Sequence, residues 1–270
     1  QYAYRDYGFP VSTNGSPAGE IPVFLINQHR IDSVQDAEDY IARLRDTKRV
    51  MEETAATMRR QAAMGIVPPE MVFEPARADA KLVLTGAPFT DGGDSSLLAD
   101  FKEKVGKLDA TQAEKDRLIA EAKAAMTGPY REGYDVLLSA LDAIEPQAKG
   151  NDGAWSLPNG EAYYDARLNF YTTTDLTADQ IHQIGLNQVA AIRAEMEAVK
   201  QEIGYEGTLE QFFEALRTDP KYQYSNDAAG REAYLDDARA AIARIMAVAP
   251  QWFERLPKAP LEVRAVEPFR

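Results

Sequence analysis

One signal for the start of a helix recurs along this chain and constrains its fold most: a threonine followed three residues later by Glu or Gln. It occurs at Thr111, Thr177 and Thr208. In such a capping box, the two side chains accept hydrogen bonds from backbone N–H groups that the first helical turn leaves unpaired. Ser33, with Asp36 in the following turn, is a further helix cap with a favourably placed acidic group. The chain is therefore expected to consist mainly of helices.

The expected ends of the helices are marked by glycine and proline. Gly65 and Gly204 each follow a long stretch of helical periodicity, and glycine readily adopts the left-handed conformation that ends a helix. Gly128 followed by Pro129 predicts an interruption, because proline lacks a backbone N–H and restricts the residue before it. The first long helix is accordingly expected over residues 33–64.

These signals divide the chain into four parts of a single helical segment, which spans residues 1–270 and belongs to a larger domain. An irregular part rich in Gly and Pro comes first, and two helical groups follow. Alternating apolar and charged residues then predict a strand that is buried on one face. The expected fold is mainly α, a multi-helix array of long antiparallel helices with little β structure. The four parts cover residues 1–32, 33–149, 150–260 and 261–270.

The amino-acid composition limits the classes of partner that this chain can be expected to bind. The chain has 43 acidic and 30 basic residues and a formal net charge of −13, which opposes nonspecific binding to nucleic acid or anionic lipid. It contains no cysteine, which excludes disulfides, thiolate catalysis and cysteine-based zinc sites. No apolar run reaches the roughly 18 residues that a membrane span requires. Neither nucleic acid nor a membrane span is expected, and these features leave the cellular compartment undecided.

The stretch over residues 160–186 combines tyrosines at helical spacing, a run of threonines and the helix start at Thr177. The tyrosines predict a short helix with an aromatic face, and the threonines predict an elbow before the next helix. Two interpretations remain open. The tyrosines can be core anchors with their hydroxyls at a wet edge, or they can line a binding surface. The candidate residues for such a surface are Tyr163, Tyr164, Tyr171, Thr172, Thr173, Thr174 and His182.

The two histidines of the chain, His29 and His182, are far apart, and neither has a companion ligand four residues away. Spacing therefore assigns them neither a metal ion nor a catalytic role. His182 falls in the second turn of the helix that Thr177 caps, where it either packs within a helix interface or faces a cleft. His29 precedes the cap at Ser33 and is expected to brace that turn. No catalytic residue is assigned.

Several segments, spread along nearly the whole chain, match a known family in the same order. Besides the stretch over residues 160–186, they are HRIDSVQDAEDYIARL over 29–44, GIVPP over 65–69, PYR over 129–131 and LEVRAVEPFR over 261–270. In these segments the chain resembles a bacterial family described as a domain of unknown function, number 885 (DUF885), whose members are similar to zinc metallopeptidases.

The resemblance implies a zinc site on a His-Glu-x-x-His helix, in which two imidazoles bind the metal and the glutamate acts as a base. This chain lacks the motif, which the resemblance places beyond Arg270. The chain is thus expected to be an internal segment that holds no cofactor, while the longer parent protein binds zinc. The expected partners are the missing C-terminal part of the same polypeptide and a peptide substrate. The resemblance also implies an exported parent, periplasmic or a lipoprotein.

Two functions follow for the segment. The first is the helical wall of a substrate cleft in a zinc-dependent peptidase-like hydrolase, with no catalytic competence of its own. The alternative is a noncatalytic helical binding or scaffold module, in which the same residues form a core. Full burial of Tyr171 and His182 would favour the scaffold, and a position on a concave, partly polar surface would favour the cleft wall. The strand over residues 261–270 either binds substrate backbone by strand addition or pairs with strands of the missing part.

Overall fold

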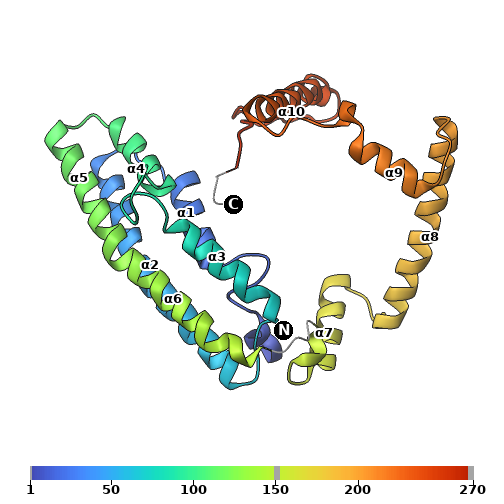
Figure 1. Cartoon of the computed structure of the whole chain (residues 1–270), viewed down its shortest axis with the longest axis horizontal. Helices are drawn as coiled ribbons and strands as arrows, with labels where there is room; N and C mark the ends of the chain where they lie inside the picture. Colours follow the sequence, from blue (N-terminus) through green and yellow to red (C-terminus); the bar gives the residue numbers. More distant parts are fainter. Residues whose placement is uncertain (1, 149–152, 267–270) are drawn as a thin grey trace. The chain divides into compact units, whose positions relative to one another are not determined.

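The computed structural model describes residues 2–148 and 153–266, which form two compact units (Figure 1). The first unit extends to Thr174, and the second comprises residues Asp175–Val266. Throughout the described ranges no β-strand is formed, and two isolated bridges join Ser12 to Gly15 and Ala87 to Asp94. The mainly α fold expected from the sequence is confirmed. No helix in the described part of the chain combines the length and apolarity that crossing a membrane requires.

The helices begin where the capping side chains predict. The hydroxyls of Ser33, Thr111, Thr177 and Thr208 each accept a hydrogen bond from the backbone N–H three residues later. The helices of the first unit are α1 (Pro17–Asn27), α2 (Val34–Ala63), α3 (Phe73–Val83), α4 (Ser96–Gly106), α5 (Gln112–Ala125), α6 (Arg131–Ile144) and α7 (Gly160–Thr172). Those of the second are α8 (Ala178–Glu202), α9 (Leu209–Thr218) and α10 (Ala228–Val248).

The N-terminal part is more regular than the sequence predicts, because α1 forms within residues 1–32. Pro17 occupies the start of α1, where a missing N–H is harmless, but Pro22 lies inside the helix. Pro22 cannot donate to the carbonyl of Ala18 four residues earlier. The hydroxyl of Tyr134 donates to that carbonyl instead, over 2.6 Å. A tertiary hydrogen bond therefore replaces the helical one, and Ala18 and Leu25 are buried beside it.

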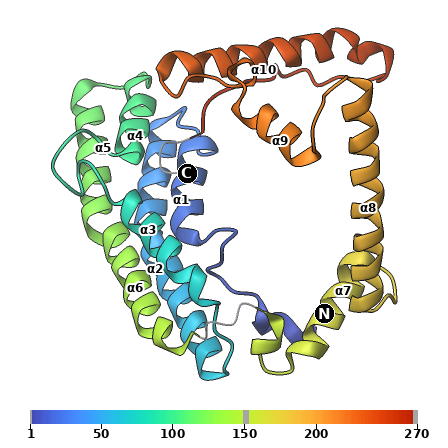
Figure 2. The same cartoon turned by 45° about the vertical axis from the view of Figure 1, so that its right-hand side comes forward.

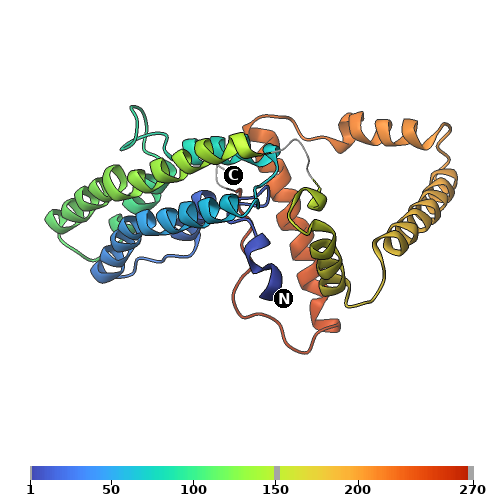
Figure 3. The same cartoon turned by 90° about the horizontal axis from the view of Figure 1, so that it is seen from below.

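The core of the first unit is formed by α2, by the long helix of α5 and α6, and by the shorter helices α1, α3 and α4. Helix α2 and the long helix lie side by side, drawn in blue and green in Figure 3. Ion pairs join Glu38 to Arg117 and Lys48 to Glu132, so the two helices run in the same direction. This pair differs from the antiparallel arrangement expected from the sequence, because α3 and α4 carry the chain back to the start of α2. Gly133 allows the close approach, since a Cβ there would lie 2.9 Å from the Lys48 Cα.

The interruption predicted at Gly128 and Pro129 is a single turn of π-helix over Met126–Tyr130. Gly128 has φ of −99° and ψ of −109°, outside the helical region. The chain nevertheless continues directly from α5 into α6, and the buried rings of Tyr130 and Tyr134 lie 4.8 Å apart. Their hydroxyls are 2.9 Å apart, and the Tyr134 hydroxyl donates to the Ala18 carbonyl of α1.

The second unit contains few contacts between its helices (Figure 2). Arg193 of α8 forms an ion pair of 2.9 Å with Glu210 of α9. The ammonium of Lys200 donates over 2.5 Å to the carbonyl of Gly207 in the connecting loop. Beyond this junction, most side chains of α8 and α10 are exposed. Leu209 and Ala249 are among the few buried apolar residues of the unit.

The strand expected over residues 261–270 is not formed in the described residues. Residues 261–266 have neither helical nor strand structure, and residues 267–270 lie outside the described ranges. A strand is stable only when another strand pairs with it, and the described chain provides none. The alternating pattern therefore indicates that residues 261–266 can form a strand, but the described residues contain no partner strand for them.

Candidate functional site

Helix α7 ends in the threonine elbow that the sequence predicts. Thr173 has a left-handed backbone conformation, with φ of 54°, and so ends the helix. The Thr172 hydroxyl donates to the Leu168 carbonyl over 2.8 Å and lies 2.8 Å from the Thr174 hydroxyl. The side-chain amide of Asn169 donates to the Thr174 carbonyl over 2.9 Å. Local hydrogen bonds thus hold the hydroxyl groups of the elbow.

The three candidate tyrosines of α7 have different surroundings. Tyr163 is half-buried, and its ring centroid lies 5.5 Å from that of Tyr4 and 4.8 Å from that of Tyr7. Tyr164 is 47% exposed and Tyr171 is 71% exposed. Tyr163 therefore belongs to a packed aromatic cluster, whereas Tyr164 and Tyr171 face solvent.

The N-terminal tyrosines attach the start of the chain to α7. The Tyr7 hydroxyl donates over 2.5 Å to the carbonyl of Pro158, which lies just before the helix. The ring of Tyr4 meets that of Tyr7 edge to face, with centroids 5.2 Å apart. Such an arrangement is favoured because the positive ring edge meets the negative ring face. The aromatic cluster of Tyr4, Tyr7 and Tyr163 thus combines residues from both ends of the first unit.

A cavity of about 390 Å³ opens beside this cluster, within the first unit. We call it the arginine cavity, because Arg5 and Arg167 are among the residues that line it. The aromatic residues Tyr4, Tyr163 and Phe170 line it as well. The cavity therefore combines positive charge with flat apolar surfaces.

Arg167 is held in place by the aromatic residues that follow it in α7. Its guanidinium lies 5.3 Å from the ring centroid of Phe170 and 4.6 Å from that of Tyr171, within the range of cation–π attraction. One of its nitrogens also donates to the Tyr171 hydroxyl over 2.5 Å. Tyr171 thus acts on the arginine cavity through Arg167 and does not line it.

The sequence reasoning missed Tyr4, Tyr7, Arg5 and Arg167. For Arg167 a signal was present, because it lies four residues after Tyr163 and four before Tyr171, on the same face of the helix. For the N-terminal residues no signal was present, because more than 150 residues separate them from α7.

His182 belongs to the second unit, whereas the other candidate residues belong to the first. It lies in the second turn of α8, and its side chain is exposed. Tyr171 is exposed as well, so the full burial expected of a scaffold core is absent at both positions. The seven candidate residues are divided between two units, and six of them lie on α7 and its elbow.

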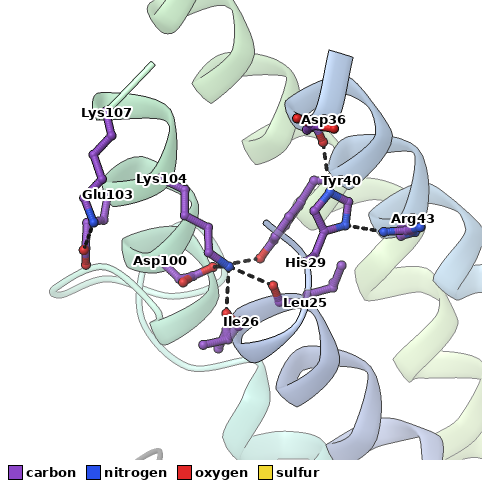
Figure 4. Close-up of polar contacts among 10 residues, drawn as sticks. All are labelled: Leu25, Ile26, His29, Asp36, Tyr40, Arg43, Asp100, Glu103, Lys104 and Lys107. Atoms are coloured by element: carbon purple, nitrogen blue, oxygen red, sulfur yellow. Dashed lines mark hydrogen bonds and ion pairs between the residues drawn. The ribbon is translucent and has the colours of Figure 1, made fainter. Parts of the chain in front are cut away.

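His29 braces the turn before α2, as expected, and does so with both ring nitrogens (Figure 4). Nε2 is 3.0 Å from the carbonyl of Asp36, and Nδ1 is 2.5 Å from Nη1 of Arg43. An arginine only donates, so Nδ1 accepts and Nε2 carries the proton. Burial of the ring lowers the pKa of His29, and the positive charges of Arg43 and Lys104 lower it further.

Lys104 of α4 closes the same cluster from the other side. Its ammonium donates to the carbonyls of Leu25 and Ile26 over 3.0 and 2.7 Å, and so caps the C-terminal end of α1 (Figure 4). It also pairs with Asp100 at 2.8 Å. Burial raises the pKa of that carboxyl, against the opposing effect of the nearby ammonium. The cluster is a structural junction of α1, α2 and α4.

We expect the first unit to lose stability as the pH falls below about 6.5, and to lose less in His29→Gln. An unfolded histidine takes up its proton near pH 6.5. In the folded chain the pKa of His29 is lower, so acidification favours the unfolded state until the folded-state pKa is also passed. The glutamine amide can donate and accept like the neutral ring, but it does not titrate. Thermal unfolding at pH 5.5 and 7.5 checks this, and equal losses in both proteins would contradict it.

A second cavity of about 430 Å³ lies at the start of α1. Its lining includes the carboxylates of Glu20 and Asp79, the apolar side chains of Val23 and Val83, and the loop ending at Ser16. This cavity has the negative character expected of a chain with net charge −13. The arginine cavity departs from that character.

The described residues do not fit a zinc ion. Over residues 2–148 and 153–266, no three side chains of His, Cys, Asp or Glu are grouped to hold a metal. Both nitrogens of His29 are engaged by protein groups, and His182 is an isolated side chain on α8. Residues of this segment are therefore not assigned as metal ligands.

Comparisons with other proteins identify a family and a similar solved structure. A family model described as "Bacterial protein of unknown function (DUF885)" matches residues 1–270. The crystal structure of a candidate lipoprotein from Colwellia psychrerythraea is similar, with 27% identity and a TM-score of 0.82 over 93% of this chain. The chain spans 43% of the length of that protein. No curated protein matches the chain.

Proposed function

From the premise that this chain belongs to the bacterial DUF885 family, we propose that it forms the helical wall of a substrate cleft in a zinc-dependent peptidase-like hydrolase. In this proposal the chain is an internal segment of a longer polypeptide, and the remainder of that polypeptide is its main partner. A peptide is the substrate. The zinc ligands lie in the remainder, so none of the chemical steps is assigned to residues of this segment.

The observation that carries the proposal is the apolar face of α8. From Val189 to Ile203, the residue that directly follows α8, every third or fourth residue along one side is apolar and exposed, including Val189 at 56% and Ile203 at 60%. An amphipathic helix of a soluble protein normally buries such a face. We define the α8 face as Val189, Ile192, Met196, Val199 and Ile203.

Further exposed residues of the second unit point the same way. On α10 and after it, Ile245 is 65% exposed and Trp252 is 80% exposed. Exposed apolar residues in such number are typical of a surface that another protein surface covers. The similar protein from Colwellia psychrerythraea is more than twice as long as the aligned region, which supports the rest of the same polypeptide as the cover.

The first unit supports the role of a cleft wall. The arginine cavity offers charged, aromatic and amide groups on a rigid helical scaffold, and such groups can orient a peptide without reacting with it. Tyr163 and Arg167 are its principal candidates on α7, and the elbow of Thr172, Thr173 and Thr174 fixes the end of that helix. Tyr164, Tyr171 and His182 remain proposed cleft residues on the ground of their exposure.

A location outside the cytoplasm is part of the proposal. It is supported by the description of the similar protein as a candidate lipoprotein. The parent protein would then act on peptides in the periplasm or at a membrane surface, to which a lipid attaches it.

The second candidate function is a noncatalytic helical binding or scaffold module. One observation favours it: the threonine hydroxyls of the elbow are engaged with neighbouring groups of the same elbow, as in a purely structural turn. The exposure of Tyr171 and His182 favours the cleft wall instead. An activity assay of the parent polypeptide separates the two functions.

We expect the parent polypeptide to hydrolyse peptides, to lose this activity with a chelator and to regain it with zinc. The assay uses a mixed peptide library with mass-spectrometric detection, so that no cleavage preference is assumed. Hydrolysis that survives chelation would contradict the zinc-dependent proposal. An absence of hydrolysis on the whole library would support the scaffold.

A substitution that adds a charge to the α8 face tests directly whether the rest of the polypeptide covers this face. In the parent polypeptide, we expect the backbone amides of α8 to exchange hydrogen more slowly than in the 270-residue chain. We expect Ile192→Asp to remove most of this protection, because a carboxylate buried against apolar groups costs several kcal/mol. Ala194→Asp is the matched control, since two residues place it on the opposite side of α8. Equal exchange in the two unaltered proteins would show that the α8 face has no cover.

A further inference from the structure

We propose that the arginine cavity binds the C-terminal carboxylate of a peptide that has an apolar or aromatic last residue. The inference rests on the proposed peptide-binding role, but it concerns binding alone and requires neither zinc nor hydrolysis. It assigns a chemical task to Arg5 and Arg167, which the sequence motifs do not single out.

The charge of the cavity is the first argument. The residues that line the cavity include two arginines and neither Asp nor Glu, in a chain whose acidic residues outnumber its basic residues by 43 to 30. Several arginines of the first unit, such as Arg49 and Arg77, pair closely with Asp or Glu. Arg167 instead contacts rings and a phenol hydroxyl, which carry no negative charge at neutral pH. Its positive charge therefore remains available to an anion.

Arg5 adds a second, weakly compensated charge. Its nearest carboxylate is that of Asp6, at 4.0 Å, and its side chain is 74% exposed. Asp6 in turn lies closer to Arg60, at 3.2 Å. A ligand carboxylate in the cavity could approach both Arg5 and Arg167, and guanidinium groups bind carboxylates with paired, charge-assisted hydrogen bonds.

The shape and walls of the cavity decide which anion fits. Tyr4, Tyr163 and Phe170 provide flat apolar walls beside the charges, which suit a side chain adjacent to a carboxylate. A volume of about 390 Å³ accommodates one or two residues.

A phosphate group fits the same observations less well. The lining has no lysine and no glycine-rich turn that could surround a phosphate with backbone N–H groups. The net charge of −13 also repels polyanions such as nucleotides at long range. A carboxylate with a single charge and an apolar neighbour is the better match.

Arg167 is also well positioned for this task. The cation–π contacts with Phe170 and Tyr171 restrict its side chain, so less conformational entropy is lost when a ligand binds. The aromatic cluster of Tyr4, Tyr7 and Tyr163 holds the N-terminal segment, and with it Arg5, against α7. The two arginines are therefore brought together by packing that does not depend on the ligand.

The test compares two probes that differ in a single group. Acetyl-alanyl-phenylalanine carries the carboxylate, and its C-terminal amide lacks the charge. We expect the 270-residue chain to bind the acid about tenfold or more tightly than the amide by calorimetry, since hydrogen bonds between charged groups are stronger than those of a neutral amide. Arg167→Gln should abolish this preference, and Arg167→Lys should retain part of it. Arg59→Gln, at an exposed position of α2, is the matched control and should change nothing.

Circular dichroism confirms that each variant keeps its helical content, so that a loss of binding is not a loss of fold. Equal affinity for the acid and the amide, or an unchanged preference in Arg167→Gln, would overturn the inference. Inorganic phosphate that displaces the acid at equal concentration would overturn the choice of a carboxylate. Peptide hydrolysis by the parent polypeptide is measured without these probes, so hydrolysis that depends on zinc together with equal binding of acid and amide would overturn the inference alone.

Discussion

Replacing Phe101 with alanine is expected to lower the free energy of unfolding of the first unit by about 3–5 kcal/mol, as deletion of a buried phenylalanine ring usually does. Phe101 is fully buried on α4, and its ring centroid lies 5.0 Å from that of Tyr40 on α2. The ring of Tyr40 also contacts His29, with centroids 5.0 Å apart. The substitution would therefore leave a cavity at the junction of α1, α2 and α4.

Stability is measured by urea denaturation. Because a chain of two units need not unfold in one step, unfolding of the first unit is followed by the hydrogen exchange of peptides from α2 and α4. Phe253→Ala is the matched control. Phe253 is 64% exposed in the second unit, and its loss should change stability by no more than about 0.5 kcal/mol. A cost below about 1 kcal/mol for Phe101→Ala would contradict the packing described for this junction.

The second large effect is expected at Gly133, where alanine should destabilise the first unit by about 1–3 kcal/mol. An added Cβ would lie 2.9 Å from the Lys48 Cα and 3.2 Å from the Lys48 backbone nitrogen. Since these are backbone atoms, α2 and α6 would have to move apart. The greater helical propensity of alanine, about 1 kcal/mol, offsets only part of this cost.

The same change at Gly19 should have the opposite sign. Gly19 lies in α1, and no atom outside the local helix backbone comes within 4 Å of its Cβ position. Gly19→Ala should therefore stabilise the unit by about 0.5–1 kcal/mol through helical propensity alone. Both variants are measured by the same urea titration. If Gly133→Ala were neutral or stabilising, the close approach of α2 and α6 would be wrong.

The sequence predicts most helix boundaries because they depend on local chemistry. Ser33, Thr177 and Thr208 are side chains that bond the backbone three residues later, so their effect can be inferred without knowledge of the rest of the fold. Helix α1 was missed for the opposite reason. Its internal Pro22 argues against a helix, and the hydrogen bond that compensates comes from Tyr134, more than 100 residues away.

The expected C-terminal strand and the relative direction of packed helices also depend on residues that lie far away in the sequence. Alternation over residues 261–266 indicates a strand, but strand pairing is a tertiary property. The parallel direction of α2 and α6 follows from the path of α3 and α4 between them, which periodicity does not encode.

The candidate site was predicted in part. Helical spacing correctly placed the tyrosines on α7 and the threonines at its end. It did not separate Tyr163, which packs against Tyr4 and Tyr7, from the exposed Tyr164. The two arginines come together only through this long-range packing, so a reading of local motifs could not have found their cavity.

The π-helical turn over Met126–Tyr130 has a consequence for how the length of this chain can vary. A π turn closes its hydrogen bond one residue later than an α turn, so it contains one residue more. Loss of a single residue there can restore an α turn and leave the buried sides of α5 and α6 facing α2. Loss of a residue from the middle of α2 would instead rotate everything after it by about 100°. Among related sequences, gaps of one residue should therefore collect at this turn and be rare in α2.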